Sequence, residues 1–98
     1  MAAILEFDTS TANSISNALG TSTVHLTDAS AVVEGRKTTG CPRVIIGPSV
    51  EQAVAERVTG LAITTNPAAG VVWRRRRVDT TVVLEALRAG ASDVIGDS

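Results

Sequence analysis

The residues of this chain that could do chemistry are few: one histidine (His25), one cysteine (Cys41) and a run of four arginines at 74–77. His25 lies between Val24 and Leu26, and no Ser or Cys stands in a nucleophile motif, which favours a structural or surface histidine over a catalytic one. A single cysteine excludes an internal disulfide and a cysteine-based zinc site. Neither a Gly-x-Gly-x-x-Gly segment nor a Gly-Lys-Ser/Thr loop is present. We therefore expect no enzyme activity, no metal and no cofactor.

The arginine run allows two interpretations. It consists of Arg74, Arg75, Arg76 and Arg77. Four adjacent guanidinium groups could contact phosphates. However, an extended strand directs alternate side chains to opposite faces, no aromatic residues are interleaved, and the net charge is −1. These features favour a solvated strand end whose arginines pair with Asp8, Asp79 or Asp97. A module that binds an anion or a nucleic acid through the four arginines is the alternative.

Composition limits the chain to one domain, residues 1–98, with a thin aliphatic core. Apolar residues make up 44% and charged residues 19%, while Phe and Trp occur once each and Tyr is absent, which argues against an aromatic-rich recognition surface. No apolar run approaches the roughly 18 residues of a membrane span. The first residues lack a basic region and carry Glu6 and Asp8 where a signal peptide would be apolar. We expect a cytoplasmic protein without membrane insertion.

The elements that must position these residues alternate regularly. Short apolar runs predict strands at 3–7, 23–27, 43–47, 70–74 and 92–95. Apolar stripes predict helices at 8–20, 28–33, 49–60 and 79–90. The segment 61–70 is ambiguous: Asn66-Pro67 marks a turn, while residues 61–63 could be a helix tail or a packed loop. This alternation with short connections predicts an α/β fold with a parallel five-stranded sheet.

Helix boundaries carry recognisable signals. Asp8 and Asp79 are residue types that cap helix N-termini, and the spacing of Ser49 to Gln52 matches a capping box. A glycine follows each of the three corresponding stripes: Gly20, Gly60 and Gly90. Trp73, inside a predicted strand, is expected to pack in the core or at an interface.

The segment 85–95, EALRAGASDVI, resembles the fourth helix and fifth strand of the receiver domain of bacterial response regulators, which end in a Gly-Ala-x-Asp-Tyr-Leu pattern. The resemblance implies a three-layer, flavodoxin-like sandwich whose sheet has the order 2-1-3-4-5. Any site would lie at the carboxyl ends of strands 1 and 3. The fifth helix of a receiver would be missing.

The resemblance also implies a phosphorylation site, which this sequence does not preserve. A receiver needs an acidic pair after strand 1 to hold Mg²⁺, and here Asp8 is followed by Thr9. Gly47 stands where the phosphoryl-accepting Asp belongs, Arg75 where a Thr or Ser belongs, and Asp97 where a Lys belongs. Without a carboxylate nucleophile, an aspartyl phosphate cannot form at this position.

The replacements suggest a new contact across the degenerate site. A basic residue has replaced the hydroxyl, and an acid has replaced the lysine. Our hypothesis is that Arg75, or its neighbour Arg74, reaches Asp97 or Asp8 and locks one conformation.

A narrower resemblance lies in GVVWRRRRVDTT at 70–81, which runs into the helix at 84–90. This stretch is similar to the N-terminal atypical receiver domain of CpaE/TadZ-type proteins, which are MinD/ParA-like ATPases of Flp (Tad) pilus assembly, with septum-site-determining relatives in actinobacteria. The resemblance implies a bacterial protein of which this chain is an N-terminal fragment, with an ATPase domain after it.

These resemblances imply a non-enzymatic pseudo-receiver module that works by protein–protein interaction, homodimerisation or localisation. It would regulate the attached ATPase, and its protein partners would belong to a pilus or division machinery. The resemblance also implies recruitment to the cell pole or septum. The candidate interaction surface consists of Val83, Leu87 and Val94, although helical spacing alone also allows Leu84 and Leu87 to be core residues. A small enzyme with an unrecognised site is a third hypothesis, which no residue type supports.

Overall fold

The computed structural model describes residues 2–20, 22–27, 43–65 and 70–96. The helix expected at 28–33, the loop after it, Cys41 and Asp97 lie outside the described residues. The strands are β1 (Ala2–Leu5), β2 (Thr23–Leu26), β3 (Arg43–Ile46), β4 (Gly70–Arg75) and β5 (Asp93–Gly96). The helices are α1 (Thr9–Leu19), α3 (Gln52–Thr65) and α4 (Thr80–Ala89).

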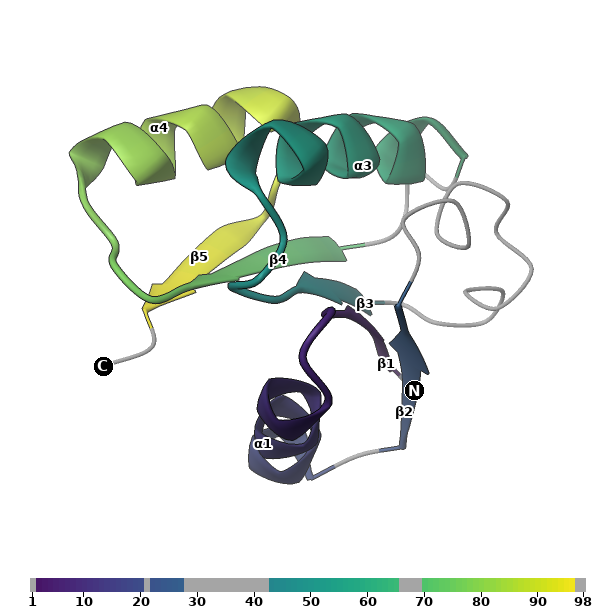
Figure 1. Ribbon diagram of the computed structural model, residues 1–98. Coiled ribbons are helices and arrows are strands. Elements are labelled where there is room, and N and C mark those ends of the chain that lie inside the picture. Colours follow the sequence, from purple (N-terminus) through teal and green to yellow (C-terminus); the bar gives the residue numbers. More distant parts are fainter. Residues whose placement is uncertain (1, 21, 28–42, 66–69, 97–98) are drawn as a thin grey trace.

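The five strands form one parallel sheet, as the alternation predicted, in the order β2-β1-β3-β4-β5 that the receiver resemblance implied. The helices α3 and α4 lie on one face of the sheet and α1 lies on the other, which gives three layers (Figure 1). The carboxyl ends of neighbouring strands are in register, with Leu5 opposite Ile46 and Ile46 opposite Trp73. Residues that follow these strands therefore meet at one edge of the sheet.

Side-chain alternation along the strands divides the core into two parts. Ala3 and Leu5 of β1 join the larger cluster, which includes residues of α3 and α4. Ile4 joins the smaller cluster, which includes Ile15 of α1. In the described part of the chain α1 is the one helix on this second face, and Ile95 of β5 remains 46% exposed.

Two helices begin and end where the sequence predicted. The Asp8 carboxylate accepts from the Thr11 N–H at the start of α1, and the Asp79 carboxylate accepts from the Val82 N–H at the start of α4. The chain leaves these helices through Gly20 and Gly90, whose φ angles of 64° and 106° favour a residue without a Cβ.

The boundaries of α3 differ from the prediction at both ends. The helix begins at Gln52 because the Ser49 side chain bonds to Glu6 and does not cap the helix. It passes through Gly60 and continues to Thr65, so 61–65 is helical. Buried Ala62 extends the contact of the helix with the core, and this packing outweighs the weak helix propensity of one glycine.

Trp73 is a core residue with a satisfied polar group. Its ring is fully buried, and its Nε1–H donates to the Thr59 hydroxyl at 2.8 Å. The same hydroxyl donates to the carbonyl of Ala55 at 2.7 Å. A buried chain of hydrogen bonds therefore connects β4 to α3 across the sheet–helix interface.

Replacing Thr59 with Val should lower the free energy of unfolding by about 1 to 3 kcal/mol, because the buried indole N–H loses its acceptor. Urea denaturation measures the change. Thr59→Ser retains the hydroxyl and should lose less. On the same helix, Thr64 donates to Gly60 at an exposed position, so Thr64→Val should change the value by no more than about 0.5 kcal/mol. Equal losses at positions 59 and 64 would contradict this account of the buried bond.

Candidate functional site

Glu6, Gly47 and Arg75 meet at the carboxyl ends of β1, β3 and β4. Glu6 and Gly47 follow directly after strand residues that are paired in register, and Arg75 ends the next strand. Parallel α/β sheets place ligand sites at this edge, where the strand order reverses. Gly47 and Arg75 thus lie where the receiver resemblance placed them.

Glu6 is a fully buried acid that the sequence reasoning missed. Its carboxylate accepts from the N–H of Ser49 at 2.9 Å, from the N–H of Asp8 at 2.6 Å and from the Ser49 hydroxyl. The Ser49 oxygen in turn accepts from the N–H of Phe7 at 3.0 Å. Glu6 therefore joins the loop after β1 to the loop after β3.

The sequence analysis assigned Asp8 instead of Glu6 to this edge because it predicted the end of the first strand two residues too late. The expected strand at 3–7 placed Asp8 at the sheet edge, whereas β1 ends at Leu5 and the acid at its end is Glu6. Phe7 already turns away, since its N–H bonds to the Ser49 side chain. The available signal was an acidic residue directly after the apolar run 2–5.

Gly47 leaves room for the Glu6 side chain. A Cβ on Gly47 would lie 2.3 Å from Oε1 of Glu6 and 2.9 Å from its Cβ and Cδ. The φ angle of Gly47 is not positive, so the backbone alone would accept another residue here. The close approach of Glu6 therefore accounts for this glycine, which has no side-chain oxygen to offer.

The Arg75 guanidinium turns inward. It donates to the carbonyl of Val50 at 2.6 Å, and its Cζ lies 5.2 Å from the centre of the Trp73 ring, within the range of a cation–π contact. Burial lowers the pKa of Arg75, and the negative charge of Glu6 opposes that shift. The acid that acts on Arg75 is thus Glu6, while the hypothesised contact with Asp97 lies outside the described residues.

Asp8 has a different role from the one expected of it. It is exposed, and its carboxylate accepts from the backbone N–H of Thr11 at 3.0 Å and from the Thr11 hydroxyl at 2.5 Å. These bonds lower the pKa of Asp8, and the positive charge of Arg76 lowers it further. Asp8 is the cap of α1 and contributes only its backbone N–H to the site.

The remaining arginines and the histidine differ in exposure. Arg74 is partly buried, whereas Arg76 and Arg77 are exposed. His25 is exposed too, and its Nε2 lies 2.7 Å from the carbonyl oxygen of Glu6, an acceptor only, so this nitrogen donates. The histidine therefore makes a structural bond, in agreement with the sequence interpretation.

The residues at this edge do not fit the Mg²⁺ ion of a receiver. Mg²⁺ requires near-octahedral coordination by oxygen. Phe7 and Gly47 supply no side-chain oxygen, and both oxygens of Glu6 already accept hydrogen bonds. In residues 2–20, 22–27, 43–65 and 70–96, no group of three or more His, Cys, Asp or Glu side chains could hold a metal ion.

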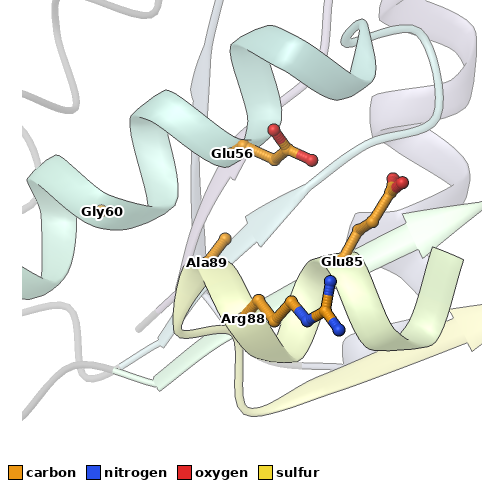
Figure 2. Close-up of a pocket in the computed structure, with 5 residues that line it drawn as sticks. All are labelled: Glu56, Gly60, Glu85, Arg88 and Ala89. Atoms are coloured by element: carbon orange, nitrogen blue, oxygen red, sulfur yellow. The ribbon is translucent and has the colours of Figure 1, made fainter. Parts of the chain in front are cut away.

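A groove between α3 and α4 is lined by Glu56, Gly60, Glu85, Arg88 and Ala89 (Figure 2). The side chains of Glu56 and Glu85 extend into the space between the two helices (Figure 2). One carboxylate oxygen of Glu85 is buried without a hydrogen-bond partner among the described residues. The lining supplies two glutamates and one arginine.

The outer side of α4 carries an exposed apolar patch, which we define as Val83, Leu84 and Leu87. Leu84 is 48% exposed, Leu87 is 51% exposed and Val83 is partly buried. The interpretation of both leucines as core residues is therefore wrong. Val94 of β5 packs against the main core and lies outside the patch.

None of the described helices is long and apolar enough to cross a membrane.

Replacing Arg75 with Met should lower the free energy of unfolding by about 1 to 2 kcal/mol, because the Val50 carbonyl loses a charged donor and Glu6 loses a nearby positive charge. Thermal or urea unfolding measures the effect. Arg77→Met, in the exposed part of the same run, should stay within about 0.5 kcal/mol of the wild type. Similar losses in the two variants would show that the inward contact of Arg75 contributes nothing.

The lowered pKa of Asp8 should be visible in the pH dependence of stability. A carboxyl whose pKa is lower in the folded state stabilises that state above its ordinary value of 3.8, and this contribution disappears as the pH falls through the folded-state pKa. Asp8→Asn keeps a capping side chain but does not titrate. Urea unfolding from about pH 6 to about pH 2 should show the wild type losing more stability than this variant. Thr11→Val should reduce the difference, and parallel curves for Asp8→Asn and wild type would disprove the assignment.

Comparison with solved structures places this geometry on a known fold. A pilus assembly protein (CpaE) from Burkholderia thailandensis E264 matches with a TM-score of 0.83 and 16% identity, over 98% of this chain and 84% of that chain. A CheY-like protein (TadZ) from Pseudomonas aeruginosa PAO1 matches with a TM-score of 0.79 and 18% identity, over 98% and 85%. A response regulator from Thermotoga maritima matches with a TM-score of 0.83 and 15% identity, over 98% and 82%.

No protein-family model and no curated protein matches the sequence. The structural likenesses, at 15% to 18% identity, establish the fold. The receiver fold implied by the sequence resemblance is confirmed, and the solved structures that share it include a pilus assembly protein (CpaE) and a CheY-like protein (TadZ).

Proposed function

We propose that this chain is a non-enzymatic pseudo-receiver module that acts by protein–protein interaction and is not phosphorylated at the usual receiver position. The observation that carries the proposal is the replacement of a phosphoryl acceptor by Gly47, with the Glu6 carboxylate in the space next to it. A receiver fold without an acceptor cannot use aspartyl phosphate at this position as its signal. What it retains is a rigid sheet and the surfaces of its helices.

The likeness to CpaE and TadZ structures supports a role in pilus assembly. In that role the module would regulate an attached MinD/ParA-like ATPase and bring it to its place in the cell. The sequence resemblance also allows a role in septum placement. The pilus assembly proteins among the structural neighbours favour the pilus role.

The α4 patch is the surface we assign to this interaction. Leu84 and Leu87 are three residues apart and so lie on the same side of the helix, with Val83 beside them. Together they form an exposed apolar strip on an element that the core holds through Ala86. A second copy of this chain, packed with its own patch, would remove both leucines from water in each protomer.

Sedimentation velocity over a range of protein concentrations tests the proposal. We expect the wild type to form a dimer and the Leu84→Glu/Leu87→Glu variant to be monomeric with an unchanged circular dichroism spectrum. Leu61→Glu, at an exposed leucine of α3, is the matched control and should remain dimeric. Acetyl phosphate with Mg²⁺ should change neither the mass of the protein nor its oligomeric state.

Three results would contradict the proposal. They are a monomeric wild type at every concentration, a dimer that survives the double substitution, and phosphorylation that alters assembly. Retention of the wild type on DNA or polyphosphate at physiological salt, lost when all four arginines at 74–77 become Ala, would instead favour the anion-binding alternative. The inward position of Arg75 argues against that alternative, since only part of the run faces solvent.

A further inference from the structure

The donors around Glu6 form a compact carboxylate-binding site. Two backbone N–H groups, from Asp8 and Ser49, and one hydroxyl, from Ser49, converge on the two oxygens of a single carboxylate. They come from loops that are far apart in the sequence, after β1 and after β3. The side chain that they hold is fully buried.

The hydrogen-bond donors around the Glu6 carboxylate, and the positive charge near it, favour a negatively charged group in this site. The Ser49 hydroxyl gives its hydrogen to Glu6, because its oxygen is already the acceptor for the Phe7 N–H. Arg75, whose charge acts on Glu6, adds a positive group from β4. A glutamine in place of Glu6 has only one acceptor oxygen and would turn its amide NH₂ group toward at least one of these donors, which is unfavourable.

We infer that this edge of the sheet is an oxyanion site permanently occupied by the chain's own Glu6, and that Gly47 is the residue that makes this occupancy possible. Glu6 and any side chain at position 47 compete for the same space, since a Cβ there would lie 2.3 Å from the Glu6 oxygen. The two loops are therefore held together without an external ligand. The inference goes beyond the proposed function, because it concerns the interior of one chain and holds whether or not the α4 patch binds a partner.

The competition can be measured with a double-mutant cycle. Gly47→Ala in the wild type should displace the Glu6 carboxylate and lower the folding equilibrium constant. In the Glu6→Ala background the contacts with Oε1 and Cδ are gone and only the 2.9 Å contact with the Cβ of residue 6 remains, so the same change should cost less. We expect the two costs to differ by about tenfold or more in the equilibrium constant. The same cost in both backgrounds would overturn the inference.

The vacated site can then be tested with a small anion. Glu6→Ala removes the Cγ methylene and the carboxylate, which together have the shape and charge of acetate. Acetate should raise the melting temperature of Glu6→Ala above its value in chloride of equal ionic strength. At an acetate concentration about ten times its Kd, the folding equilibrium constant should rise roughly tenfold. The wild type, whose site is filled, should not respond.

Two further variants provide controls. Glu51→Ala removes an exposed acid and should show no response to acetate. Glu6→Ala/Ser49→Ala removes the hydroxyl donor and should lose most of the response. If Glu6→Ala is unfolded in chloride, recovery of its circular dichroism spectrum in acetate becomes the measurement. Equal responses of wild type and Glu6→Ala, or a Glu6→Gln variant with the stability of the wild type, would show that no such site exists.

Discussion

The constraint on which the functional edge of this protein depends is one buried carboxylate. An ionised acid is costly to bury unless its oxygens are hydrogen-bonded, and Glu6 meets this condition with donors from two loops. Its position accounts for the residues around it. Gly47 has no side chain that would clash with the carboxylate. The Ser49 hydroxyl bonds to the carboxylate and does not cap α3, and Arg75 of β4 places a positive charge nearby.

The protein has the fold of a receiver, but our proposal does not assign it the phosphorylation chemistry of receivers. The sheet has the receiver order, and its carboxyl edge gathers residues from the same strands. However, both oxygens of the Glu6 carboxylate at that edge already accept hydrogen bonds from the loops after β1 and β3. Our proposal assigns the protein–protein interaction to the exposed apolar patch on α4. In that proposal the carboxyl edge of the sheet serves to join the loops after β1 and β3.

Much of the fold could be predicted because its signals are local. Apolar runs of four or five residues indicated the strands, and Asp8, Gly20, Asp79 and Gly90 marked helix ends through bonds and φ angles within a few residues. The errors concern contacts between distant segments. Ser49 has the spacing of a capping box, yet its hydroxyl bonds to a residue 43 positions away. Gly60 has the position of a helix stop, yet core packing carries the helix past it.

The sequence by itself determined the order of strands and helices, because that order depends on residue type and spacing along the chain. The sheet order 2-1-3-4-5 and the interpretation of Gly47 as a lost acceptor came from the resemblance to receivers, and the structure confirms the sheet order. Only the tertiary structure decided which acid serves the site. Glu6 and Asp8 are two residues apart and both follow the first strand. They differ in where the chain turns, which places Glu6 among converging donors from two loops and Asp8 at an exposed helix cap. The acid directly after the apolar run 2–5 was a local signal for Glu6, but the hydrogen bonds between loops that hold it form only once the strands are in register.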